Sequence, residues 1–198
     1  ATVYMFMPMV GAFVTHRFIC KERGSGIPDV SFRLNRWFVA GWVLPLVLSL
    51  GAFGVALLFP GVSFTWGLEG ITERFAGSMD KETLRLMQEQ TQTMPLHPFW
   101  ISLLSGMIAG ATVNAVAGFG EEAGWRGFLQ RELRGLGFWK MSLLIGVIWG
   151  VWHAPIIAQG HNYPQHPHMG VAMMIIWTVL LSPLFSFIRI KSGSVIAP

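Results

Sequence analysis

Two adjacent glutamates, Glu121 and Glu122, close a long apolar stretch of the sequence, and Arg126 follows them in the segment GFGEEAGWRG. Ionisable groups at membrane depth are costly, so such residues usually have a function and a partner. Glu122 and Arg126 are four residues apart, which puts them on one face of a helix as an ion pair. Glu121 projects about 100° away and stays available for other chemistry. On spacing alone, a structural alternative stays open, in which both glutamates stabilise the N-terminus of an interfacial helix.

A second group of interest is the segment IWGVWHAP, in which Trp149 and His153 lie four residues apart. Gly146 and Gly150 form a stripe of small residues, so a neighbouring helix can approach closely. Taken alone, His153 is more often a hydrogen-bonded structural residue. Together with Glu121 it forms a candidate pair of general base and water-holding residue, because the proton affinities of histidine and glutamate are readily tuned near neutrality.

Other metal-binding side chains are few. The loop HNYPQHPH contains His161, His166 and His168, and a solvated loop explains this group more simply than a metal site does. Cys20 is the single cysteine, which excludes an intramolecular disulfide and a cysteine-based metal cluster.

The composition indicates that helices in a membrane position these residues. The chain is 53% hydrophobic and 12% charged, whereas an ordinary soluble domain has roughly 25% charged residues. We therefore expect an all-α fold, a polytopic transmembrane helix bundle that forms a single membrane domain over residues 1–198 and is incomplete at both ends. A span needs about 20 mostly apolar residues. The five expected spans cover about Thr2–Val14, Phe38–Phe59, Phe99–Phe119, Met141–Ile157 and Met169–Ile188.

The charges of the loops predict the orientation of the helices, because Lys and Arg accumulate in short cytoplasmic loops. We expect a multi-pass protein of the cell membrane in which the Arg17–Arg36 and Arg126–Lys140 loops are cytoplasmic. The acidic stretch Val62–His97 and the uncharged loop Gly160–His168 then lie outside, with a short exposed helix at Asp80–Gln92. The net charge of +4 is explained by this pattern, so no nucleic-acid partner is expected.

The sequence resembles the CPBP intramembrane proteases, also called the Abi or CAAX-protease family, which includes prenyl-protein endopeptidases. The family motif EExxxR is matched by Glu121, Glu122 and Arg126, and EEAGWRG looks like its bacterial version. The second motif, usually FxxxH, is matched by Trp149 and His153, with tryptophan in place of phenylalanine. The resemblance covers the core motifs in residues 99–198, whereas the first two helices fit it loosely.

This resemblance implies an intramembrane endopeptidase that cleaves membrane-associated peptides or proteins, with CAAX-type prenylated proteins as one substrate class. Glu121 would activate a water for attack on the peptide carbonyl, and His153 would help to hold that water. Glu122 and Arg126 would fix the geometry of the motif. If a metal such as zinc is bound, His153 and Glu121 would hold it, but a metal-free glutamate mechanism is at least as well supported.

One family motif is not matched. The family has a histidine followed four residues later by asparagine or a similar residue, after a stretch resembling KSGSVIAP, and this sequence stops there, at Pro198. These side chains would stabilise the oxyanion, so we expect residues 1–198 alone to be inactive.

Two other functions stay open. The same fold could be a catalytically silent scaffold that binds a membrane partner. It could also be a transporter in which Glu121, Glu122 and His153 form a proton or cation path, although the sequence shows neither an inverted repeat nor a matching pair of broken helices.

We predict that Gln88 lies outside and Gly135 in the cytoplasm, because the charges of their loops differ in sign. Cysteines introduced at these two positions in a Cys20→Ser background should react with an impermeant thiol reagent from opposite sides of the membrane. Labelling of both positions from one side would contradict the five-helix topology.

Overall fold

The computed structural model describes residues 2–21, 29–64, 80–92, 96 and 98–198, and every regular element in these ranges is a helix. The predicted all-α fold is therefore confirmed. The chain divides into two compact units. The first combines Ala1–Val43 with Thr112–Pro198, and the second is Leu44–Ala111.

Several helices are suited to a membrane by length and composition. Three are long and apolar enough to cross it, namely α3 (Arg36–Ala56), α9 (Phe138–Ala158) and α10 (Pro167–Ser192). The consecutive segments Phe99–Ala111 and Val113–Leu136 meet the same criterion together as a broken pair, and Val3–Ile19 is a shorter apolar stretch. The polytopic membrane character is thus confirmed, whereas the number of five spans and the single domain stay predictions.

The window expected as one helix, Phe99–Phe119, is divided at Thr112. The backbone there has φ −124° and ψ −95°, which is not helical, and it separates α6 (Pro98–Ala111) from α7 (Val113–Glu122). Val116 N–H still donates to the Thr112 carbonyl at 3.2 Å, so α7 begins immediately after the break. Glu121 and Glu122 are the last two residues of α7.

The unit Leu44–Ala111 contains the C-terminal part of α3, together with α5 (Lys81–Gln92) and α6. Asp80 caps α5: one carboxylate oxygen accepts from Thr83 N–H at 2.9 Å and the other from the Thr83 hydroxyl at 2.6 Å. These hydrogen bonds from Thr83 lower the pKa of Asp80, because they favour the ionised carboxylate. The short helix predicted at Asp80–Gln92 is confirmed.

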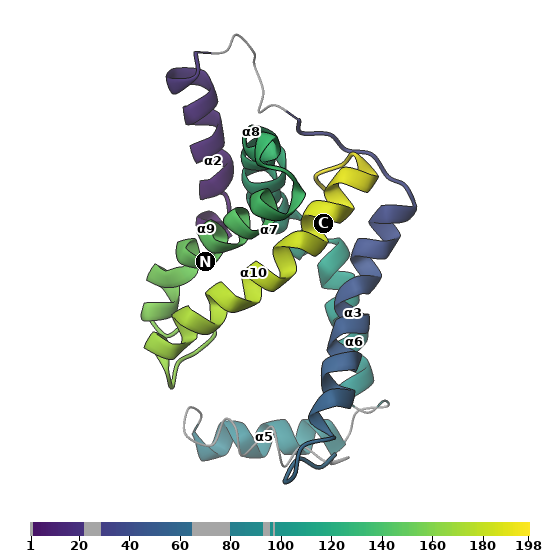
Figure 1. Ribbon diagram of the computed structural model, residues 1–198. Helices are drawn as coiled ribbons and strands as arrows, with labels where there is room; N and C mark the ends of the chain where they lie inside the picture. Colours follow the sequence, from purple (N-terminus) through teal and green to yellow (C-terminus); the bar gives the residue numbers. More distant parts are fainter. Residues whose placement is uncertain (1, 22–28, 65–79, 93–95, 97) are drawn as a thin grey trace. The chain divides into compact units, whose positions relative to one another are not determined.

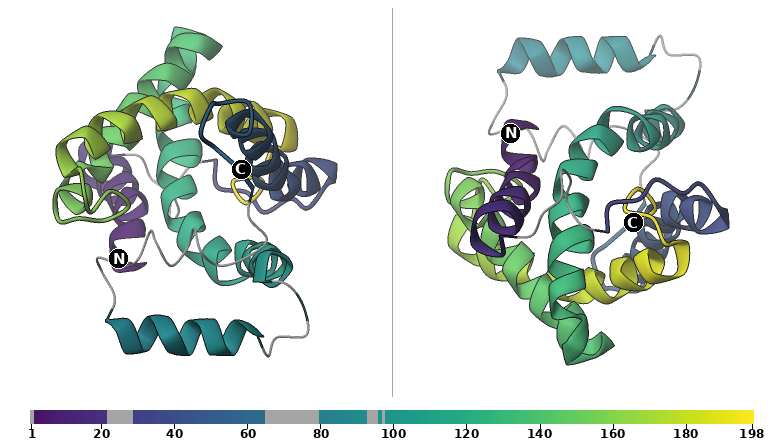
Figure 2. Two further views of the ribbon diagram at one scale, coloured as in Figure 1. Left: turned by 90° about the horizontal axis from the view of Figure 1, so that it is seen from below. Right: turned by 90° about the horizontal axis from the view of Figure 1, so that it is seen from above.

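In the other unit, the N-terminal helices pack directly on the segment that contains the two glutamates (Figure 2). A Cβ atom added at Gly120 would lie 2.7 Å from the Met5 carbonyl oxygen, and one at Gly124 would lie 2.5 Å from Pro8 Cβ. Both positions must therefore be glycine for the backbones to approach so closely. The elements in contact are α1 (Thr2–Met5) and α2 (Met7–Val14) on one side, and α7 and the π-helical η2 (Ala123–Leu129) on the other. The π-helical η1 (Thr15–Ile19) follows α2.

Helices α9 and α10 pack side by side in the same unit (Figure 1). A Cβ added at Gly146 would lie 2.7 Å from Val179 Cα, and one at Gly150 would lie 2.6 Å from Ile175 Cα. The Thr178 hydroxyl, buried on α10, donates to the Gly146 carbonyl at 2.9 Å. The predicted stripe of small residues thus packs against a neighbouring helix, and that helix is α10.

The remaining elements connect and close this unit. The short helices α8 (Gln130–Leu133) and η3 (Arg134–Leu136) lead from η2 to α9. After α10, Val195 N–H donates to the Ser31 carbonyl at 3.0 Å, and Asn35 Nδ2 donates to the Ser192 carbonyl at 2.8 Å. These bonds fasten the segment before α3 to the end of α10.

Replacing Gly150 by alanine should lower the thermal stability of the protein in detergent. The new methyl group meets main-chain atoms that cannot rotate away, and overpacking of this kind costs about 1–3 kcal/mol. Gly11→Ala is the matched control. Among the described residues, and apart from the nearby backbone of its own helix, no atom lies within 4 Å of a Cβ placed at Gly11. A Gly150→Ala melting temperature equal to that of the control would contradict the close packing of α9 on α10.

Candidate active site

The EExxxR motif occupies the end of α7 and the first half of η2. Its side chains are buried: Glu121 is 6%, Glu122 8% and Arg126 1% exposed. The π-helical turn closes with a hydrogen bond from Gln130 N–H to the carbonyl of Trp125, five residues earlier. Such widened turns occur frequently at functional sites, where they redirect side chains. Arg126 therefore lies inside the unit. In the stretch Arg126–Lys140, expected as a cytoplasmic loop, the exposed basic residues are Arg134 and Lys140.

Glu122 and Arg126 form the predicted ion pair, with 2.8 Å between Arg126 Nη1 and Glu122 Oε1. The Arg126 guanidinium also lies 4.5 Å from the ring centroid of Trp149 on α9 and 5.0 Å from that of Phe185 on α10. Arginine is attracted to the faces of aromatic rings at such distances. Arg126 thus links η2 to both neighbouring helices.

Glu121 turns away from this pair toward α9, as the spacing predicted. The Trp149 indole Nε1–H donates to Glu121 Oε2 at 2.8 Å, which joins two residues 28 positions apart in the sequence. Phenylalanine, the usual residue at this position of the motif, has no hydrogen to donate. The tryptophan substitution therefore adds a direct hydrogen bond between the two motifs.

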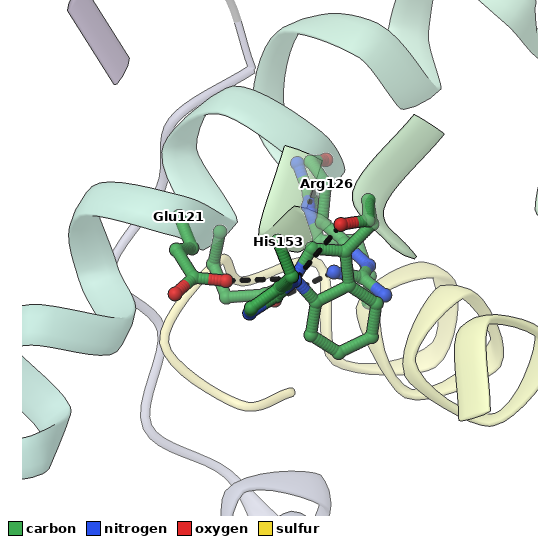
Figure 3. Close-up of polar contacts among 6 residues, drawn as sticks. Glu121, Arg126 and His153 are labelled. Atoms are coloured by element: carbon green, nitrogen blue, oxygen red, sulfur yellow. Dashed lines mark hydrogen bonds and ion pairs between the residues drawn. The ribbon is translucent and has the colours of Figure 1, made fainter. Parts of the chain in front are cut away.

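His153 is oriented by the same tryptophan. Its Nδ1 lies 2.9 Å from the Trp149 carbonyl oxygen. Because a carbonyl oxygen only accepts, Nδ1 must bear the hydrogen, and the lone pair of the neutral ring is then on Nε2. The charge of Arg126 also acts electrostatically on the Glu121 carboxylate. Figure 3 shows Glu121, Arg126 and His153 gathered at one place.

Two residues at this place were not recognised from the sequence as part of it. Arg189 donates from Nε to the Arg126 carbonyl at 3.1 Å and from Nη2 to the Asp29 carbonyl at 2.6 Å. Phe185 supplies one of the rings against Arg126. Their positions on an apolar helix contain no signal for these contacts, which depend on how α10 packs on η2.

The described residues offer few donors for a metal ion. Within them, no group of three or more His, Cys, Asp or Glu side chains converges, and His161, His166 and His168 lie around the turn between α9 and α10. Glu121 and His153 supply two donors, whereas a catalytic zinc normally has three protein ligands. The described donor set alone therefore does not fit a zinc ion.

The fold and this site define a helical membrane protein in which a buried carboxylate and a histidine meet at the junction of two motifs. The family model of the type II CAAX prenyl endopeptidase Rce1-like proteins matches residues 95–198, more than half of the chain. The chain belongs to this family, which is one of proteases, and the resemblance inferred from the two motifs is confirmed. No curated protein and no solved structure matches the chain.

Replacing Glu122 by glutamine should destabilise the protein strongly, because it removes the carboxylate that forms the ion pair with the buried Arg126 guanidinium. Breaking a buried pair in this way typically costs about 3–5 kcal/mol. The control is Glu89→Gln, which breaks an exposed ion pair with Arg85. The two residues of that pair are also four apart, with 2.9 Å between Arg85 Nε and Glu89 Oε1, and its loss should change stability little. Thermal unfolding in detergent measures both, and equal melting temperatures for the two variants would contradict the structural role of the Glu122–Arg126 pair.

Proposed function

We propose that this protein is an intramembrane endopeptidase in which Glu121 activates a water molecule to hydrolyse a peptide bond. The observation that carries the proposal is the double role of Trp149. Its indole nitrogen holds the Glu121 carboxylate and its carbonyl oxygen holds the His153 ring. One residue thus orients both side chains that would handle the water.

The proposed chemistry follows from the atoms that remain available. Trp149 occupies Oε2 of Glu121, so Oε1 would accept a proton from the water. Nε2 of His153 bears a lone pair and would accept a hydrogen bond from the second hydrogen of the same water. The water oxygen then attacks the peptide carbonyl carbon, and the Glu121 carboxyl passes its proton to the leaving amine as the C–N bond breaks.

Glu122 and Arg126 support this reaction without taking part in proton transfer. Their charges compensate each other, and Arg126 is held between two rings from different helices. This arrangement keeps the end of α7 in register with α9, and small displacements of a general base cost rate steeply. In the proposal, Glu122 and Arg126 are positioning residues.

The proposed substrates are membrane-associated proteins, with CAAX-type prenylated chains as the class that the family description names. The apolar helices support a site reached from the bilayer. We further propose that the protein lies in the cell membrane with the Arg17–Arg36 and Arg126–Lys140 stretches at the cytoplasmic side, where their exposed basic residues would satisfy the positive-inside rule.

Glu121→Gln should abolish cleavage of a prenylated CAAX peptide by the protein expressed from its complete reading frame. Glutamine keeps the size of the side chain and an oxygen that can accept from Trp149, but it cannot take a proton, and loss of a general base typically costs about a hundred- to ten-thousand-fold in turnover. The matched control is Glu132→Gln, because Glu132 is an exposed glutamate on α8. This variant should cleave the peptide at the unaltered rate.

The assay is run on purified protein in detergent, with equal melting temperatures required of the two variants. Substantial turnover by Glu121→Gln would contradict its role as base. Detergent also separates the protease from a transporter, because cleavage survives loss of the membrane barrier and transport does not. The same peptide without its prenyl group shows whether the lipid is needed for recognition.

A further inference from the structure

The N-terminal helices are built into the wall of the candidate active site, although they lie outside the region that the family model matches. Gly120 and Gly124, on either side of the two glutamates, leave no room for a Cβ against Met5, Phe6 and Pro8. The backbone of Met5 to Pro8 is therefore in close contact with the segment that contains Glu121.

Tyr4 precedes this segment and contacts Trp152, the residue next to His153. Its hydroxyl donates to the Trp152 carbonyl at 2.5 Å. Its ring stacks on the Trp152 indole, with 4.4 Å between centroids and 19° between the planes. Trp152 in turn meets the His153 ring edge to face at 4.7 Å. A continuous chain of aromatic contacts thus runs from Tyr4 to the histidine.

The backbone of α9 has one hydrogen bond fewer here. Pro155 has no N–H, so the Val151 carbonyl lacks its usual helical donor, and the proline ring pushes the preceding turn apart. His153 is in this weakened turn. Tyr4 supplies an external hydrogen bond to the adjacent carbonyl, that of Trp152, and the N-terminal helix thereby stabilises the part of α9 that presents the histidine.

Tyr4 also lies close enough to Glu121 for the carboxylate to act electrostatically on its hydroxyl group. The hydroxyl hydrogen is already committed to the Trp152 carbonyl, so Tyr4 would act on the reaction through Trp152 and not as a proton donor to the substrate. The geometrical link of this phenol is the one to His153 through Trp152, and its link to Glu121 is electrostatic.

We propose that Tyr4 is a positioning residue of the active site, which fixes Trp152 and through it the ring of His153 opposite Glu121. This inference rests on the proposed function. It also assigns the N-terminal helices a direct part in the site.

The first test separates the hydroxyl from the ring. Tyr4→Phe keeps the stacking on Trp152 and removes the hydrogen bond, and it should lower kcat by about three- to tenfold with KM unchanged. Tyr4→Leu removes both contacts and should lower kcat further. Tyr163→Phe is the matched control, since Tyr163 lies in the turn after the C-terminal end of α9, and it should leave kcat and KM unaltered.

The second test measures by NMR whether Tyr4 lies near Glu121, and it does not depend on a cleavage assay. 3-Fluorotyrosine is incorporated, and the fluorine signals of Tyr4 and Tyr163 are assigned by NMR with the two Tyr→Phe variants. Glu121→Gln removes a charge beside Tyr4, so it should shift the Tyr4 signal and leave the Tyr163 signal in place.

The outcomes are distinguishable. A Tyr4 signal that does not respond to Glu121→Gln would overturn the placement of Tyr4 in the site. A signal that responds, combined with full kcat in Tyr4→Phe, would overturn the positioning role and leave the proposed function standing. Cleavage retained by Glu121→Gln would overturn the proposed function, and with it the role of Tyr4, whatever the fluorine signals show.

Discussion

A buried guanidinium is the constraint on which this structure depends. The side chain of Arg126 has no exposure to solvent, and a charge in an apolar interior must be paired and packed or the fold is lost. Glu122 supplies the counter-charge, while Trp149 and Phe185 supply ring faces from two different helices. These contacts of one side chain therefore bring η2, α9 and α10 together at a single place.

Close approach of the backbones makes that meeting possible. Between helices in a bilayer there is no hydrophobic driving force, so packing and hydrogen bonds decide the association. Gly120 and Gly124 admit the N-terminal helices, and Gly146 and Gly150 admit α10. The Thr178 hydroxyl adds a hydrogen bond across the second of these interfaces. Side chains at the junction are consequently held by main chain on several sides.

The two adjacent glutamates show how position on a helix separates chemical roles. Successive residues on a helix point about 100° apart, so Glu122 faces Arg126 and Glu121 faces α9. Glu122 is compensated by a full charge, whereas Glu121 accepts a neutral indole hydrogen. In the proposed mechanism, Glu121 is the one of the two that acts on the substrate water. The same tryptophan orients His153, so a single residue of α9 holds both Glu121 and His153.

The sequence alone determined the features that depend on local spacing. The apolar windows predicted α9 and α10, spacing of four predicted the Glu122–Arg126 pair and the Gly146–Gly150 stripe, and two short motifs were sufficient to recognise the family. Only the tertiary structure decided what crosses between helices. The Trp149–Glu121 hydrogen bond joins residues 28 apart and the Tyr4–Trp152 contact residues 148 apart. The break at Thr112 likewise lies inside a window that reads as one continuous apolar helix. No helical period encodes such contacts, because they depend on which faces the packed backbones bring together.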